Sequence, residues 1–129
     1  MPNEFYAGDV PSLARENGAF RRVLFTTERS QLVLMSLEPG GEIGEEVHEG
    51  VDQVLVFVEG RGEAIVEATR QSVGPGIVVV VPAGARHNFV ASAGGPLKLY
   101  TVYTPPEHAP GTVHETKAEA DAAELDHHR

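Results

Sequence analysis

The chain of 129 residues contains no cysteine, which excludes disulfide bonds, thiolate nucleophiles and thiolate metal sites. This absence leaves the cellular compartment open. Basic residues are also few: 10 Lys and Arg stand against 19 Asp and Glu, for a net charge of −9. Because phosphate binding needs clustered Lys and Arg, we expect no nucleic-acid partner.

Long apolar segments are missing as well. No apolar run approaches the roughly 20 residues that a membrane-spanning helix needs, so we expect no membrane partner. The opening residues MPNEFYAGDV contain no basic region followed by an apolar run, so a secretory signal is not expected. With 41% hydrophobic and 22% charged residues, the sequence predicts one soluble globular domain in the cytoplasm.

Short runs that favour β-structure alternate with glycine and proline from residue 20 onward. Breaks such as EPGG, EGRG and SAGGP have the composition of turns. Strands are predicted at 20–26, 31–38, 44–48, 53–59, 63–69, 77–81, 85–91 and 97–103. Since no helix-length connection separates these strands, they predict an all-β antiparallel sandwich or barrel. The run IVVVV at 77–81 is apolar on both faces, which is typical of a strand buried from both sides.

The two ends of the chain do not follow this pattern. The final residues are rich in Ala and Glu and predict one short helix. Thr112 and Glu115 have the spacing of a capping box, and Thr116 and Glu119 repeat it. The predicted organisation is an N-terminal arm of loop and short strand at 1–19, a barrel at 20–105, and a C-terminal loop with a short helix at 106–129.

The stretch GGEIGEEVHEGVDQ places polar residues where a core strand is expected. Glu46 and His48 are two residues apart and therefore share one face of a strand. His87 lies on a later strand, and its neighbours on the same face are apolar. If these faces meet, Glu46, His48, Gln53 and His87 converge inside the barrel. Two imidazoles, a carboxylate and an amide oxygen suit a divalent transition metal.

These residues resemble the two sequence motifs of the cupin superfamily. The first motif is similar to the run Gly40, Glu46, His48, Gln53, Gly60, and the second to Gly76, Pro82, Gly84, His87. The resemblance implies a small single-domain bacterial cupin, whose fold is a double-stranded β-helix, or jelly roll. It implies metal ligands at Glu46, His48, Gln53 and His87. Glu46 stands where the family usually has His, and Gln53 where it usually has Glu, so two histidines and one carboxylate are retained.

The resemblance implies a divalent transition metal (Mn, Fe, Zn or Ni) and a small-molecule substrate or ligand. One hypothesis is a metal-dependent isomerase, lyase or dioxygenase acting on a small polar substrate. A second is a non-catalytic module that binds a metal or small molecule as a sensor or store. A third is a metal-free barrel in which Glu46 and His48 form a buried hydrogen-bonded pair. Small cupins commonly pair, so a homodimer is expected.

Several assignments stay open at this point. Gln53 either ligates the metal or hydrogen-bonds to a ligand or substrate from outside the coordination sphere. No catalytic residue is assigned, because no serine lies in a GxSxG context. His108 and His114 follow the last strand and are predicted to lie in a solvated loop. Arg61 and Arg86, in or beside turns, could attract an anionic substrate.

Overall fold

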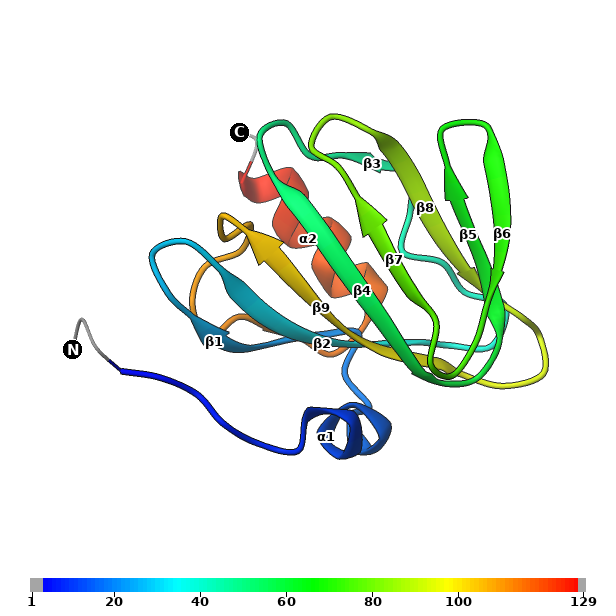
Figure 1. Ribbon diagram of the computed structural model, residues 1–129, viewed down its shortest axis with the longest axis horizontal. Helices are drawn as coiled ribbons and strands as arrows, with labels where there is room; N and C mark the ends of the chain where they lie inside the picture. The colour runs from blue at the N-terminus through cyan, green and yellow to red at the C-terminus, as the bar shows by residue number, and fades with distance from the viewer. Residues whose placement is uncertain (1–3, 128–129) are drawn as a thin grey trace.

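Two antiparallel sheets face each other and enclose the core (Figure 1). The structure is a computed structural model that describes residues 4–127. The larger sheet has the order β10-β1-β2-β9-β4-β7 and the smaller sheet the order β3-β8-β5-β6. The larger sheet contains β1 (Arg21–Thr26), β2 (Gln31–Leu37), β4 (Asp52–Glu59), β7 (Val78–Val81), β9 (Leu97–Thr104) and β10 (Val113–His114). The smaller sheet contains β3 (Glu46–Val47), β5 (Gly62–Val66), β6 (Thr69–Val73) and β8 (Arg86–Ala91).

Alternate residues of the central strands fill the space between the sheets. Leu55 and Phe57 of β4 and Leu99 of β9 are completely buried from the larger sheet. Phe89 of β8 reaches them from the smaller sheet, with its ring centroid 5.8 Å from that of Phe57. Each such side chain contributes about 1.5–3 kcal/mol when it leaves water. The predicted all-β jelly roll with a C-terminal helix is therefore confirmed.

Three predicted elements differ from the structure. The region 63–69, predicted as one strand, is the β5–β6 hairpin, which turns at Glu67 with a φ of 54°. The short strand β10, paired with β1, was not predicted. The predicted loop and short strand of the N-terminal arm are wrong where helix α1 (Val10–Glu16) forms. Asp9 caps that helix by accepting a hydrogen bond from the Ser12 amide, and Pro11 lies in its first turn.

The apolar strand β7 is not buried from both sides. It forms an edge of the larger sheet, and Val78 and Val80 are 54% and 63% exposed. The alternation that buries Val81 turns these two valines outward, because successive side chains point to opposite faces. An apolar surface therefore lies on the outside of the larger sheet.

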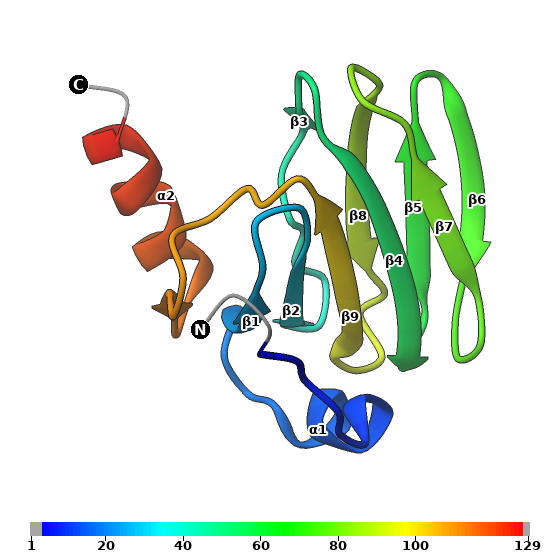
Figure 2. The same ribbon diagram turned by 60° about the vertical axis from the view of Figure 1, so that its left-hand side comes forward.

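Helix α2 (Lys117–His127) stands outside the sheets, on the side of β1 (Figure 2). Of the two possible capping boxes, the second forms: the Thr116 hydroxyl accepts from the Glu119 amide at 3.1 Å, and the Glu119 carboxylate accepts from the Thr116 amide at 3.3 Å. Ala120 is buried and ties the helix to the core. In the described part of the chain, no helix is long and apolar enough to cross a membrane.

We predict that Gly60→Ala strongly destabilises the barrel. Gly60 follows β4 with a φ of +88°, and a Cβ at this position would collide with the backbone oxygen of Pro96. A left-handed conformation costs a side chain about 1–2 kcal/mol, and a forced backbone shift about 1–3 kcal/mol more. Urea denaturation should therefore show a loss of roughly 2–5 kcal/mol in the free energy of unfolding.

Gly95→Ala is the matched control for this substitution. A Cβ at Gly95 meets nothing within 4 Å, and its φ is outside the left-handed region. Its unfolding free energy should stay near that of the wild type. Equal effects of the two substitutions would contradict the steric account of the Gly60 turn.

Candidate functional site

Strand pairing brings the predicted acid and histidines together. In the β3–β8 pair, Glu46 lies directly opposite His87. His48 follows β3, and its Nε2 lies 3.3 Å from Oε1 of Glu46. One ligand atom from each of Glu46, His48 and His87 lies within 4.8 Å of the other two. The predicted convergence of these three side chains is therefore present.

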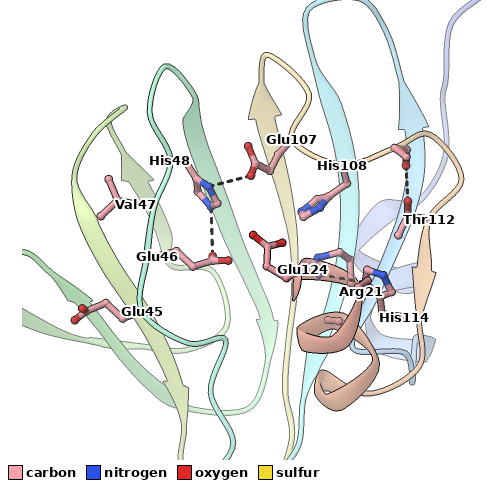
Figure 3. A pocket seen from close by; sticks show the side chains of 13 residues that line it. Arg21, Glu45, Glu46, Val47, His48, Glu107, His108, Thr112, His114 and Glu124 are labelled. Carbon is pink, nitrogen blue, oxygen red and sulfur yellow. Dashed lines mark hydrogen bonds and ion pairs between the residues drawn. The ribbon is translucent and has the colours of Figure 1, made fainter. Parts of the chain in front are cut away.

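His48 is oriented by a carboxylate that the sequence reasoning missed. Its Nδ1 lies 3.2 Å from Oε2 of Glu107, on the segment after β9 (Figure 3). An N–H at Nδ1 donates to this carboxylate, and the other ring nitrogen, Nε2, faces Glu46. A carboxylate behind a histidine is a common device for directing the opposite nitrogen at a metal.

His87 is oriented by the backbone. The side chain is 3% exposed, and its Nδ1 lies 2.9 Å from the carbonyl oxygen of Ala85. Because a carbonyl oxygen only accepts, Nδ1 carries the proton and Nε2 holds a lone pair. That Nε2 is buried and has no hydrogen-bond partner in the structure.

Gln53 shows the same arrangement on the opposite sheet. Its Nε2 donates to the Thr101 hydroxyl at 3.1 Å, and this hydroxyl donates to the Val54 carbonyl at 2.8 Å. Since the hydroxyl proton is already used, Thr101 can only accept from Gln53, which fixes the amide orientation. Its Oε1 is left buried without a partner, and its strand neighbour Tyr103 packs edge-on against His48. Both predicted roles of this oxygen, metal ligand and hydrogen-bond acceptor outside the coordination sphere, stay predictions.

The unpartnered atoms form a donor set that fits a divalent cation. Nε2 of His87 and Oε1 of Gln53 are buried without a hydrogen bond, and Nε2 of His48 faces only the Glu46 carboxylate, at 3.3 Å. Each such atom costs about 1–3 kcal/mol in lost hydration. The two imidazoles and the Glu46 carboxylate, whose ligand atoms lie within 4.8 Å of one another, would repay this cost by holding one transition-metal ion. The residues present therefore fit the metal that the fold suggests.

The charges around His48 are strongly coupled. Burial by itself lowers the pKa of His48, but the hydrogen bonds and charges of Glu107 and Glu46 outweigh burial and raise the pKa to about 9. The same hydrogen bond from His48 lowers the pKa of Glu107, against the effect of its partial burial. Without a metal, an imidazolium therefore lies between two carboxylates.

His108 does not lie in a solvated loop, so that prediction is wrong. Its backbone N–H and C=O both bond to the buried Gln31 side chain, at 3.0 and 2.6 Å. Its ring packs edge-on against Tyr103 with centroids 5.2 Å apart. Burial, followed by the positive charge of Arg21, lowers the pKa of His108 to about 3, so the imidazole is neutral at pH 7.

A pocket of about 630 Å³ lies beside the cluster (Figure 3), and its lining does not include His87 or Gln53. Glu46 and His48 line one part of it, and His108, His114 and Arg21 line another. Arg61 and Arg86, predicted as possible anion sites, do not line this pocket, and Arg86 instead pairs with Glu45 on the surface.

Among the charged residues of the pocket, Arg21 and Glu107 were not identified from the sequence. Arg21 had a usable signal, since the alternation of β1 places it on the buried face with Val23. Glu107 had none, because it lies in an irregular segment whose path depends on the tertiary structure.

Comparisons with known proteins place the chain among similar sequences and structures. It is 44% identical over 122 residues to the uncharacterized protein YrkC of Bacillus subtilis, covering 90% of this chain and 66% of YrkC. It is 36% identical to the uncharacterized protein L612 of Acanthamoeba polyphaga mimivirus, covering 86% of this chain and 72% of L612. The chain thus spans somewhat less than two thirds of the length of YrkC.

Solved structures give the same picture. BH2720 from Bacillus halodurans is 38% identical with a TM-score of 0.91, over 93% of this chain and 96% of that one. TT1209 from Thermus thermophilus is 32% identical with a TM-score of 0.68, over 77% and 96%. The Cupin_2 family, described as a cupin domain, matches residues 33–103, from β2 to β9. With the two facing sheets and the motif residues in place, this match shows that the chain belongs to the cupin domain family.

Proposed function

We propose that this cupin binds a divalent transition metal and acts as a metal-dependent enzyme, of isomerase, lyase or dioxygenase type, on a small polar substrate. One observation carries the proposal. Glu46, His48 and His87 bring their ligand atoms within 4.8 Å of one another, the buried Nε2 of His87 lacks a hydrogen-bond partner, and Glu46 and His48 line a pocket. A cytoplasmic location remains part of this proposal.

Some residues would hold the metal ion, and others would orient its ligands or contact the substrate. Glu46, His48, His87 and Gln53 would hold the ion, which when bound polarises a carbonyl or hydroxyl group and lowers the pKa of bound water. Glu107 keeps Nδ1 of His48 protonated and so fixes which nitrogen faces the cluster. Its carboxylate also lines the pocket at 29% exposure, where it can accept a proton from a bound molecule.

A non-catalytic binding module is the alternative function. It would use the same donor atoms, and the neutral Gln53 fits a weaker site. The presence of Glu107, a deprotonated carboxylate beside both the cluster and the pocket, favours the enzyme.

We also propose that the protein is a homodimer, as small cupins commonly are. Val78 and Val80 project from the edge of the larger sheet and are more than half exposed. A sheet edge with apolar side chains is a liability unless another surface covers it. A second copy can cover this edge with the same edge, since a twofold interface is self-complementary.

The dimer is tested with Val80→Lys, measured by light scattering after size exclusion. We expect the wild type at the mass of two chains and the variant at the mass of one, because a lysine cannot be buried there without a partner. Ile77→Lys adds the same charge at an exposed position just outside β7, and so controls for the effect of charge alone. A monomeric wild type would refute the dimer.

The metal is tested by plasma mass spectrometry of untagged protein. We expect about one transition-metal ion per chain, lost in His48→Ala and in His87→Ala because each removes one of a few ligands. His114→Ala is the matched control, since His114 also lines the pocket but bonds to Arg21 and lies outside the cluster. It should keep its metal.

The variants must retain the fold, checked by circular dichroism. A wild type that carries no metal and takes up none from Mn, Fe, Zn or Ni salts would leave Glu46 and His48 as a polar core pair. The enzyme proposal would then be dropped.

The metal-free protein should lose stability as the pH rises from about 6.5 to about 9. The pKa of His48 is raised from 6.5 to about 9 on folding, so the folded state binds this proton more tightly than the unfolded state. The stabilisation is complete below pH 6.5 and disappears through pH 9. At about 1.4 kcal/mol per pKa unit, it is on the order of 3 kcal/mol.

The measurement is the melting temperature of chelator-treated protein across this range. His48→Gln should flatten the profile between pH 6.5 and 9, because its amide does not titrate. An unchanged slope in this variant would show that another group causes the pH dependence.

A further inference from the structure

Arg21 occupies a core position but has no anionic partner. It lies on β1 on the same face as Val23, and its side chain is 6% exposed. Its Nη1 bonds to Nδ1 of His114 at 3.2 Å, and its guanidinium lies 5.2 Å from the centre of the Phe20 ring. Within residues 4–127, Arg21 forms no ion pair. Its Nε is buried without any hydrogen-bond partner.

A buried guanidinium in this state is costly for the folded protein. An unpaired charge loses its hydration on burial, and the ring nitrogen of His114, the Tyr103 hydroxyl and the Phe20 ring return only part of it. The positive charge of Arg21 lowers the pKa of Glu107, but Glu107 makes its own ion pair with His48. The edge of the guanidinium that contains Nε therefore lacks the anion that would balance it.

A second unpartnered nitrogen faces the same space. Nε2 of His108 is buried without a hydrogen bond, and His108 and Arg21 both line the pocket that Glu46 and His48 enter. Figure 3 shows His108 between the His48–Glu107 pair and Arg21. Gln31 holds the backbone of His108 at both its N–H and its C=O, so the ring is fixed in place.

We propose that Arg21, with His108, binds the carboxylate of a small organic acid whose other oxygen atoms reach toward Glu46 and His48. The proposal deepens the proposed function and rests on it for the second half of the ligand. A guanidinium is a planar fork of N–H donors that matches the two oxygens of a carboxylate, and the Nε–H of Arg21 is a donor without a partner.

The pocket selects a singly charged acid over a phosphate. Glu45, Glu46, Glu107 and Glu124 line it together with a single arginine. These carboxylates repel a dianion more strongly than a monoanion, so we expect a monocarboxylate to bind more tightly than phosphate. A monocarboxylate needs only the N–H donors of one guanidinium.

The test uses glycolate, its neutral amide glycolamide, and inorganic phosphate as probes for metal-loaded, full-length protein. The readout is the Nε–H signal of Arg21 in a ¹H–¹⁵N spectrum, assigned by its loss in Arg21→Lys. We expect glycolate to move this signal and glycolamide to leave it in place. An Nε–H that glycolate does not move overturns the site, and phosphate binding tighter than glycolate overturns the carboxylate assignment.

Affinity measurements by calorimetry complete the test. Arg21→Gln should weaken glycolate binding about 10- to 100-fold, leave glycolamide binding unchanged and keep the bound metal. Arg22→Gln is the matched control, because Arg22 is the next residue on β1 and faces the other way, toward Asn17. Equal glycolate affinity in Arg21→Gln and the wild type overturns the proposal. If Arg21→Gln does not fold, Arg21→Lys and the wild-type Nε–H titration decide.

Repeating the titration on chelator-treated protein separates the two proposals. If the protein takes up no metal from added salts but glycolate still moves the Arg21 Nε–H signal, the metalloenzyme is refuted and the anion site is supported. A metal-loaded protein whose Nε–H ignores glycolate would refute the anion site and leave the metalloenzyme standing.

Discussion

A buried polar atom needs a hydrogen-bond partner, and this constraint governs the barrel interior. At His48, Gln53 and His87, the protein anchors one end of the side chain with a hydrogen bond. His87 is held at Nδ1 by a backbone oxygen, Gln53 at Nε2 by Thr101, and His48 at Nδ1 by Glu107. The other end of His87 and of Gln53 is left without a hydrogen bond, and that of His48 faces Glu46. Because the anchors are backbone or fixed side chains, the orientation of these opposite ends is set by the fold, as the proposed metal site requires.

The segment after β9 decides what lies above this cluster. Gln31, buried on β2, accepts hydrogen bonds from the amides of Glu107 and His108 and donates to the His108 carbonyl. One side chain thus sets the position of both residues at the pocket. The family match covers residues 33–103, so Arg21, Gln31, Glu107 and His108 all lie outside it. Membership of the cupin family accounts for the barrel, whereas these four residues lie outside the part of the chain that the family match covers.

Most of the fold was accessible from the sequence because each strand carries its own signal. Turn chemistry marked the breaks, and the capping pair Thr116 and Glu119 marked the start of α2. The β5–β6 hairpin was missed because its turn lacks glycine and uses Glu67 at positive φ. The outward exposure of Val78 and Val80 was missed because an apolar run looks the same on a central strand and on an edge strand.

The sequence by itself determined the strand pattern and the set Glu46, His48 and His87, since period-two alternation assigns residues to a face wherever they stand in the fold. Only the tertiary structure decided which faces meet, through the pairing of Glu46 with His87 across β3 and β8. It also decided the partners of His48 and Arg21, because Glu107 and His114 are distant in sequence and reach them through irregular or very short segments. Local pattern fixes direction along a strand, but contacts between distant segments depend on the packing of the whole chain.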